Sequence, residues 1–214
     1  PLMQLTIHPL TPDRWPDLEA IFNARGCSVA RGCWCMCYRR SGPVQAAPGQ
    51  LHAEVKKAQF KAVVDAGPPP GLIAYRVDPG ADDGGGAPDT TGAYSRRGTP
   101  VGWLSVGPRE HYAKLARSPV MKPVDKMPVW SVICFVVPAE HRGQGIARAL
   151  LNAAIPWAAQ QGATLLEAYP IDKPGPTHPD NLWFGTKGMF DAAGFTEVAR
   201  RKPERPVVRI KPVA

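Results

Sequence analysis

One short segment near the middle of the chain has the composition of an anion-binding loop. Residues 141–147 read His-Arg-Gly-Gln-Gly-Ile-Ala. Glycines let a backbone approach a ligand closely and adopt conformations that other residues avoid. A helix that begins directly after such a loop presents free backbone N–H groups and the positive end of its dipole. Because Arg142 adds a fixed positive charge, the segment is suited to binding a pyrophosphate.

Two other phosphate-binding motifs do not fit this segment. A P-loop needs a Lys and a Ser or Thr after its second glycine, whereas Ile146 and Ala147 follow Gly145. A dinucleotide fingerprint needs a third glycine, and Ala147 comes too early to take that place. Glycines can also serve only the packing of a strand–helix turn, an alternative that the segment by itself leaves open.

The hydrophobic pattern predicts the elements that flank this loop. Residues 127–137 form a continuous apolar run, which is typical of a central strand buried on both faces. Residues 144–161 carry an apolar stripe at helical spacing, and Pro156 within it is expected to kink or loosen the helix. The loop is therefore expected between a buried strand and an amphipathic helix.

The remaining elements complete a mixed α/β pattern with one strand–loop–helix crossover. Further helices are predicted at residues 11–26, 48–66 and 187–193, and further strands at 4–8, 72–77, 101–106, 164–169, 195–201 and 207–210. Residues 78–99 are rich in Gly, Asp and Ser, and we expect them to form a flexible hairpin insertion. The length of 214 residues suits a single domain over residues 1–214.

Composition narrows the class of partner. The net charge is +8, but the basic residues are scattered, and the basic stretch 200–211 is interleaved with prolines instead of aromatic residues. A surface for stacking nucleic-acid bases is therefore not expected. The sequence contains neither a signal-like N-terminus nor a run of about 18 apolar residues, so we expect a cytoplasmic protein without a membrane partner. The five cysteines are an odd number, which argues against a disulfide framework.

Residues 142–147 resemble the R/Q-x-x-G-x-G/A motif of the GCN5-related N-acetyltransferase (GNAT) family. The resemblance extends to the Val-Val-Pro strand end before the loop and to Gly194-Phe195 after the last short helix. It implies the acyl-CoA N-acyltransferase type of fold, an α/β (α+β) arrangement with a mixed, mostly antiparallel twisted sheet of six to seven strands flanked by about four helices. The implied activity is acetyl-CoA-dependent transfer of an acetyl group to a primary amine of a small molecule or protein, by direct attack on the thioester. A homodimer is an open alternative.

The resemblance also implies where the donor binds. In this family the strand before the loop splays from its neighbour at a bulge, and its exposed backbone groups pair with the pantetheine arm, here those of Phe135, Val136 and Val137. The same strand could donate to the tetrahedral oxyanion. Acetyl-CoA is the expected co-substrate, and no metal is expected. The pyrophosphate is expected on the backbone N–H groups of Arg142, Gly143, Gln144, Gly145, Ile146 and Ala147.

The sequence departs from the family pattern at the usual proton donor. Many family members use a Tyr in a Phe-Tyr-x-x-x-Gly-Phe stretch as the acid, and this position is Phe190, which has no proton to give. We predict Glu167 and Tyr169 as substitutes, because strand alternation points both to one face, and Asp172 in the following loop. Direct protonation of the leaving thiolate by water remains an alternative.

A cysteine-rich segment lies between the first two predicted helices, in the region that shapes the acceptor pocket in this family. Its thiols are Cys27, Cys33, Cys35 and Cys37. Structural zinc sites prefer pairs of cysteines two to four residues apart with a longer stretch between the pairs, so this spacing is poor for zinc. The alternatives left open are a coenzyme A-binding regulatory module without turnover, and a cysteine-rich zinc or redox protein.

Overall fold

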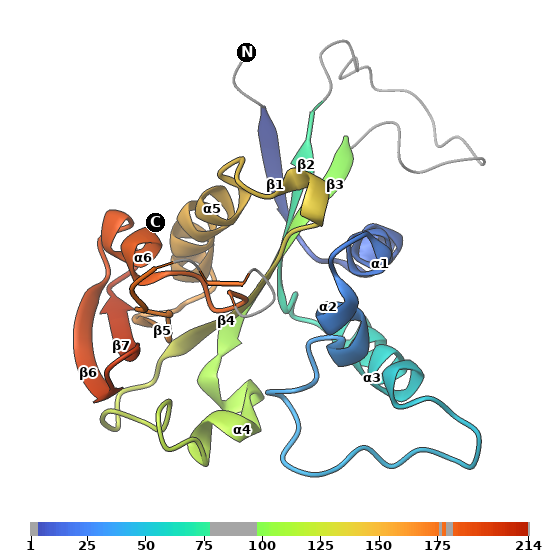
Figure 1. Cartoon of the computed structure of the whole chain (residues 1–214), viewed down its shortest axis with the longest axis horizontal. Helices are drawn as coiled ribbons and strands as arrows, with labels where there is room; N and C mark the ends of the chain where they lie inside the picture. The colour runs from blue at the N-terminus through green and yellow to red at the C-terminus, as the bar shows by residue number, and fades with distance from the viewer. Residues whose placement is uncertain (1–3, 78–97, 176, 179–181, 214) are drawn as a thin grey trace.

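A computed structural model describes residues 4–77, 98–175, 177–178 and 182–213. Its sheet has seven strands in the order β1-β2-β3-β4-β5-β7-β6 (Figure 1). Only β4 and β5 pair in parallel, so the predicted mixed, mostly antiparallel sheet is confirmed. Almost all of the expected insertion at 78–99 lies outside the described residues. The strands are β1 (Leu5–Pro9), β2 (Gly71–Arg76), β3 (Thr99–Pro108), β4 (Trp130–Val136), β5 (Leu166–Ala168), β6 (Thr196–Lys202) and β7 (Arg205–Ile210).

Six α-helices accompany the sheet in the described part of the chain. They are α1 (Trp15–Asn23), α2 (Ser28–Cys33), α3 (His52–Ala66), α4 (Ala113–Ala116), α5 (Ile146–Gln160) and α6 (Lys187–Ala192). The short helices α2 and α4 fall in stretches that were expected to be loops. Helix α5 continues through Pro156 for one further turn. The first helix begins later than predicted, because Pro12–Arg14 form a 3₁₀ turn and the Thr11 hydroxyl donates to Asp13 instead of capping the helix.

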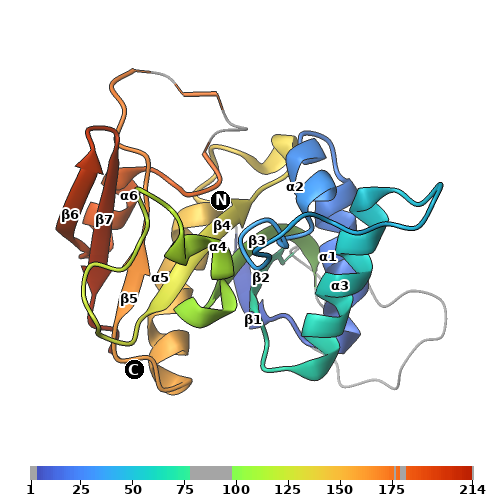
Figure 2. The same cartoon turned by 90° about the horizontal axis from the view of Figure 1, so that it is seen from below.

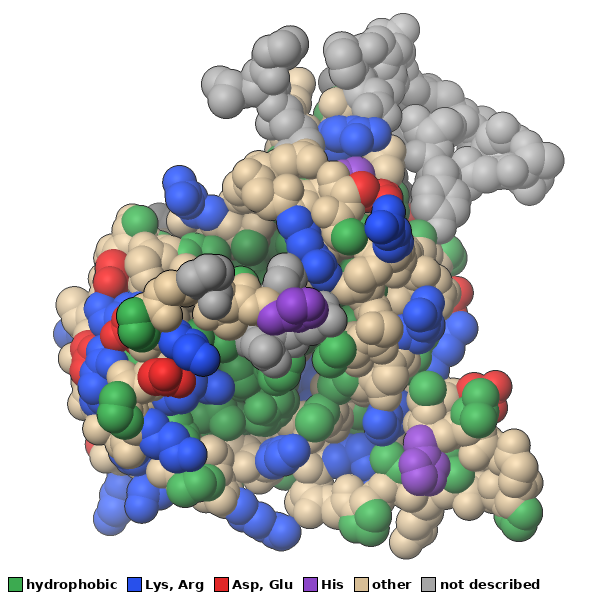
Figure 3. Space-filling model, viewed as in Figure 1, with side chains coloured by type: hydrophobic (Ala, Val, Ile, Leu, Met, Phe, Trp, Pro, Cys, Tyr) green, Lys and Arg blue, Asp and Glu red, His purple; other side chains and the backbone are tan. Residues whose placement is uncertain are grey.

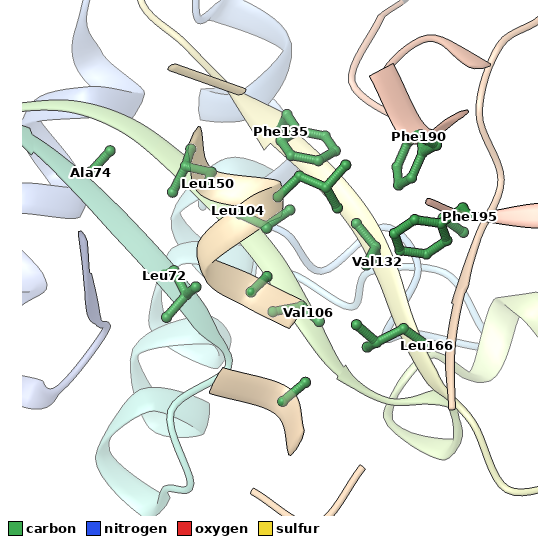
Figure 4. Packing of buried hydrophobic residues seen from close by; sticks show 14 of the residues in the cluster. Leu72, Ala74, Leu104, Val106, Val132, Phe135, Leu150, Leu166, Phe190 and Phe195 are labelled. Atoms are coloured by element: carbon green, nitrogen blue, oxygen red, sulfur yellow. The ribbon is translucent and has the colours of Figure 1, made fainter. Parts of the chain in front are cut away.

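The helices cover the two faces of the sheet in two groups. Helices α5 and α6 pack on one face, and α1 and α3 pack on the other (Figures 1 and 2). On the first face, Leu150 of α5 belongs to the same buried cluster as Leu104 of β3 and Phe135 of β4 (Figure 4). On the second face, Phe60 of α3 lies edge-on to Trp103 of β3, with ring centroids 6.0 Å apart. The alternation of side chains along each strand thus supplies both cores.

Strand β4 changes its partners halfway along its length. Its first three residues, Trp130–Val132, pair with β5, whereas no strand among the described residues pairs with the rest of β4 on that side. On the other side, Ser105 of β3 faces Cys134 while Val106 faces Val132, so Ile133 is an extra residue that forms a bulge. The splayed edge after the bulge is the arrangement that the sequence resemblance implied. No helix in the described part of the chain is long and apolar enough to span a lipid bilayer.

Candidate active site

A cavity of about 820 Å³ opens beside the free edge of β4. Its walls come from the second half of β4, the glycine loop with the first turn of α5, the segment around α2, and residues 182–189. Figure 3 shows hydrophobic side chains gathered in a hollow at the centre of the face that carries these elements. A cavity of this volume is within the range of small-molecule and cofactor sites.

The glycine loop has a backbone that other residues would adopt only under strain. Gly143 and Gly145 have φ angles of +75° and +81°. A Cβ atom added at either position would meet no described atom within 4 Å, so the conformation, and not lack of space, calls for glycine. Gly145 caps α5, and the first helical hydrogen bond runs from the N–H of Ala149 to its carbonyl. The N–H groups of the first turn of α5 are thereby left for an acceptor outside the helix.

Eight of the nine residues predicted to hold the donor line the cavity, namely Phe135, Val136, Val137, Arg142, Gly143, Gly145, Ile146 and Ala147. The ninth, Gln144, turns its amide back to donate to the carbonyl of Glu140 at 2.9 Å. Arg142 has a bracing role in addition, since its guanidinium donates to the carbonyls of Val137 at 3.1 Å and Gly26 at 2.6 Å. Arg148, which sequence reasoning did not single out, also lines the cavity.

The free edge of β4 is partly occupied by the chain itself. The N–H of Phe135 donates to the carbonyl of Trp183 at 2.7 Å, and the Trp183 side chain lines the cavity. The carbonyl of Val137 already accepts from Arg142. A pantetheine arm along this edge would therefore compete with internal hydrogen bonds.

The structure brings together Glu167 and Tyr169, two of the three predicted proton-transfer residues. The Tyr169 hydroxyl donates to Oε1 of Glu167 at 2.7 Å, and both side chains are fully buried. The Glu167 carboxylate lies between two guanidinium groups, 2.6 Å from Arg109 and 2.8 Å from Arg209. Burial and the neighbouring Glu167 charge hold the pKa of Tyr169 well above its usual value. Neither residue belongs to the described residues that line the cavity.

The third predicted residue, Asp172, lies apart from this pair. Its carboxylate is 2.7 Å from the guanidinium of Arg200, in a pair where both side chains are about one-third exposed. Its backbone N–H donates to the carbonyl of Glu204 at 2.9 Å, which ties the loop after β5 to the β6–β7 hairpin. Asp172 likewise is not among the described lining residues of the cavity.

Phe190, at the position of the family's usual tyrosine, is a core residue. Its side chain is fully buried, and its ring lies edge-on to Phe135 and to Phe195, with centroids 6.2 Å and 5.1 Å apart. Figure 4 shows the three rings in one part of the buried cluster, to the side of α5. The position thus contributes packing and provides no proton donor.

Tyr38 carries a hydroxyl group that was not among the predicted proton-transfer groups. It lines the cavity and packs in the cluster that contains Ile133 and Cys134, at the bulge of β4. Burial, together with the charge at Cys37, raises the pKa of Tyr38 to about 12, so the hydroxyl is protonated at neutral pH. Only the tertiary fold brings Tyr38 next to β4, because nearly a hundred residues separate them in the sequence.

Residues 69–174 match the family model of the acetyltransferase (GNAT) family. The chain belongs to the GNAT family. In kind it is therefore an acyltransferase, and the glycine loop at residues 141–147 falls within the matched segment. None of the curated proteins is similar enough in sequence to count as a match.

Solved structures of several acetyltransferases are similar to the chain along nearly its whole length. One is an acetyltransferase from Thermus thermophilus, at 15% identity and a TM-score of 0.49, with 98% of each chain covered. Another is the diaminobutyrate acetyltransferase of Paenibacillus lautus, in complex with L-2,4-diaminobutyric acid and coenzyme A, at 14% identity and a TM-score of 0.47, covering 98% of this chain and 96% of that one. A third is an N-acetyltransferase from Thermoplasma acidophilum in complex with coenzyme A, at 12% identity and a TM-score of 0.46, covering 98% and 99%.

Proposed function

We propose that this GNAT protein is an acetyl-CoA-dependent N-acetyltransferase, which moves the acetyl group to a primary amine by direct attack on the thioester. The observation that carries the proposal is the continuity of one cavity. It joins the free edge of β4 to the glycine loop at the start of α5. A long ligand with an anionic end and an amide-bearing arm would fit this cavity. Its anionic end suits the loop because N–H groups at the start of a helix bind phosphates. Its arm suits β4 because a strand edge pairs with amides.

In this proposal the pyrophosphate lies on the backbone from Arg142 to Ala147, and Arg148 adds charge from the next residue of α5. The pantetheine arm follows β4 from Val137 toward Phe135 and takes the place of the Trp183 carbonyl. The thioester then lies near the bulge at Ile133, where backbone donors of β4 could stabilise the tetrahedral oxyanion. Coenzyme A supplies the activated acyl group as a thioester, and the chain supplies binding, orientation and protons.

We assign proton donation to the leaving thiolate to Tyr38. Its hydroxyl is protonated at neutral pH, and Tyr38 both lines the cavity and packs in the cluster that contains Ile133 and Cys134. Glu167 and Tyr169 then have a structural role, since Glu167 is fully committed to Arg109 and Arg209. Asp172 likewise serves the surface pair with Arg200.

The acceptor side of the cavity favours an amine that arrives neutral. The described lining residues include Lys114, Arg142 and Arg148 but no Asp or Glu that could take up a proton or attract an ammonium group. Amines with a low pKa, such as α-amino groups, are therefore better acceptors in this proposal than alkyl ammonium groups such as lysine side chains. Both small molecules and protein N-termini carry such amines.

The decisive experiment measures thiol release from acetyl-CoA in the presence of a panel of primary amines, with binding of coenzyme A measured separately. We expect release that depends on the amine, and a Tyr38→Phe variant with kcat lowered by about tenfold to hundredfold but with unchanged affinity for coenzyme A. Tyr112→Phe is the matched control, because Tyr112 is buried beside the site and bonded to Ser105. Binding of coenzyme A without any release would favour the alternative, a regulatory coenzyme A-binding module.

A further inference from the structure

All five cysteines of the chain line the same cavity as the glycine loop. They come from separate parts of the fold: Cys134 lies at the bulge of β4, and the other four lie in and around α2. No disulfide joins any of these five described cysteines. Such a concentration of thiols in one cavity goes beyond what the proposed acetyl transfer requires, since that reaction needs no protein thiol.

The turn after α2 brings Cys33 and Cys37 together. Trp34 and Cys35 have left-handed backbone conformations, with φ angles of +46° and +52°, which are unusual for residues other than glycine. The N–H of Met36 donates to the carbonyl of Cys33 at 3.0 Å, so the chain turns back on itself at once. This reversal places Cys33 and Cys37, four residues apart, on the same wall of the cavity. Strained backbone of this kind is frequent at functional sites.

The turn is fixed by packing on one side and by a hydrogen bond on the other. The Trp34 ring is buried and stacks on Trp15, with centroids 5.7 Å apart. The Cys35 sulfur accepts from the indole N–H of Trp103 at 3.1 Å. Because Trp34 and Cys35 are anchored in the core, the cysteines on either side of them are held at the cavity wall.

Cationic groups from two helices surround Cys37. The ammonium of Lys114, in α4, lies 3.6 Å from the Cys37 sulfur. Lys56, in α3, donates to the carbonyl of Gly32 at 2.7 Å and faces the same turn. Cys37 is exposed and Cys33 is half-buried. The hydrogen bond from the Cys33 thiol, followed by the charge of Lys114, lowers the pKa of Cys37 to about 5, so Cys37 is a thiolate at neutral pH.

We propose that Cys33 and Cys37 form a redox-active dithiol that reacts with low-molecular-weight disulfides entering the cavity. The Cys37 thiolate attacks one sulfur of the disulfide, which forms a mixed disulfide at Cys37 and releases the first small thiolate. The Cys33 thiol loses its proton to solvent and attacks the Cys37 sulfur, and the second small thiolate leaves. Protonation of the two released thiolates completes the balance: two protein thiols are oxidised to one disulfide, and one small disulfide is reduced to two thiols.

Cys37 is the attacking residue and Cys33 the resolving one for physical reasons. Attack requires a thiolate that the partner can reach, and Cys37 is both the more exposed of the two and the one beside Lys114. Cys35 is buried and bonded to Trp103, so it is poorly placed to meet a disulfide in solution. Within the described residues, no group of three or more His, Cys, Asp and Glu side chains is arranged to hold a metal ion.

The first test follows the pH dependence of alkylation of Cys37 by iodoacetamide, with the modified residue identified by mass spectrometry. A thiolate that persists far below neutral pH should react at nearly the same rate at pH 8 and pH 6, within about twofold. An ordinary thiol slows by roughly fifty- to hundredfold over that range, and the same residue in urea-unfolded protein supplies this reference. A parallel loss of rate for folded and unfolded protein would overturn the proposal.

The second test exposes the reduced protein to glutathione disulfide and counts the remaining thiols. We expect the loss of two thiols, with residues 33 and 37 joined, so that proteolytic cleavage after Trp34 fails to separate them until a reductant is added. Cys33→Ser should stop at a glutathione adduct on Cys37, and Cys37→Ser should form neither adduct nor disulfide. Cys27→Ser, another cavity cysteine, is the matched control and should behave as the unmodified protein.

Three results would overturn the proposal: a disulfide that maps to Cys35 and Cys134, an unchanged reaction in Cys37→Ser, or near-stoichiometric zinc that protects the thiols. Neither test uses acetyl-CoA or an amine. Failure of acetyl transfer and failure of the dithiol are therefore distinguishable.

Discussion

The backbone N–H of Phe135 donates a 2.7 Å hydrogen bond to the carbonyl oxygen of Trp183. This bond joins the free edge of β4 to the segment just before α6, at the place where the pantetheine arm is proposed to lie. Coenzyme A and the Trp183 carbonyl thus compete for the N–H group of Phe135. Binding of coenzyme A should therefore move the Trp183 backbone, and with it an indole ring that lines the cavity.

We expect coenzyme A to change the tryptophan fluorescence of the protein through Trp183. The chain has six tryptophans, so the assignment requires a variant, and Trp183→Phe should lose most of the change while keeping its affinity within about threefold. Trp130→Phe is the matched control. Trp130 lies at the other end of β4, edge-on to Trp157 at 5.7 Å, and should leave the change intact. An undiminished signal in Trp183→Phe would show that this segment does not respond to the ligand.

Substitutions at two glycines can distinguish an effect on folding stability from an effect on coenzyme A binding. Gly145 and Gly162 have similar φ angles, +81° and +87°, and a Cβ at either position would meet no described atom within 4 Å. Alanine at either site should therefore cost about 1 kcal/mol of folding free energy, from the left-handed backbone alone. Only Gly145→Ala should also weaken coenzyme A binding, by about tenfold, because Gly162 lies beyond the far end of α5. Thermal unfolding and isothermal titration supply the two numbers, and equal affinities in the two variants would contradict the placement of the donor.

Much of the fold follows from local patterns in the sequence. The continuous apolar run around Val132 and the stripe around Leu150 are long and regular, and the structure has a strand and a helix there. The elements that the sequence did not predict are short. Helix α2 has only six residues and contains glycine, so its stability comes from packing against α1 and α3, which the sequence pattern does not display. Thr11 has the residue type of a helix cap, but its hydroxyl bonds to Asp13.

The same distinction between local patterns and tertiary packing applies to the candidate site. A contiguous strand–loop segment, residues 135–147, is visible in the sequence, and eight of its nine predicted donor-site positions line the cavity. Contacts between side chains from distant segments cannot be predicted from such local patterns. Strand alternation placed Glu167 and Tyr169 together, but it could not show that Arg109 and Arg209 enclose Glu167. In the same way Tyr38 is distant in sequence from the strand it packs on.

The enclosure of Glu167 leads to a prediction about stability. Its carboxylate is fully buried between the guanidinium groups of Arg109 and Arg209. Glu167→Gln should destabilise the protein by about 3 kcal/mol, because it leaves buried positive charge uncompensated. Glu197→Gln is the matched control at an exposed pair with Arg200, and it should change the free energy of unfolding by less than about 1 kcal/mol. Chemical denaturation provides both values.

The same variant separates a structural role from a catalytic one. If Glu167 is structural, the folded fraction of Glu167→Gln at low temperature should keep kcat within about threefold and an unchanged pH profile. If Glu167 is the general base that strand alternation first suggested, kcat should fall by about a hundredfold and the acidic limb of the profile should disappear. The second outcome would return Glu167 to the catalytic machinery and remove the assignment made from its ion pairs.

The last prediction concerns the acceptor and follows from the charge of the cavity wall. Because the described lining residues include no Asp or Glu, and the Cys37 sulfur lies against the Lys114 ammonium, we expect an amine that arrives without its proton to react faster. An α-amino group has a pKa near 8 and a lysine-type amine a pKa near 10.4, so at pH 7 the neutral fraction differs by roughly two hundredfold. We expect kcat/KM at pH 7 to favour α-amines by at least about tenfold over alkyl amines of similar size. The α-amine rate should level off above about pH 8, whereas the alkyl-amine rate should keep rising toward pH 10. A tertiary amine is the control and should give no product, and equal rates for both amine classes at pH 7 would reveal a base that acts from within the protein.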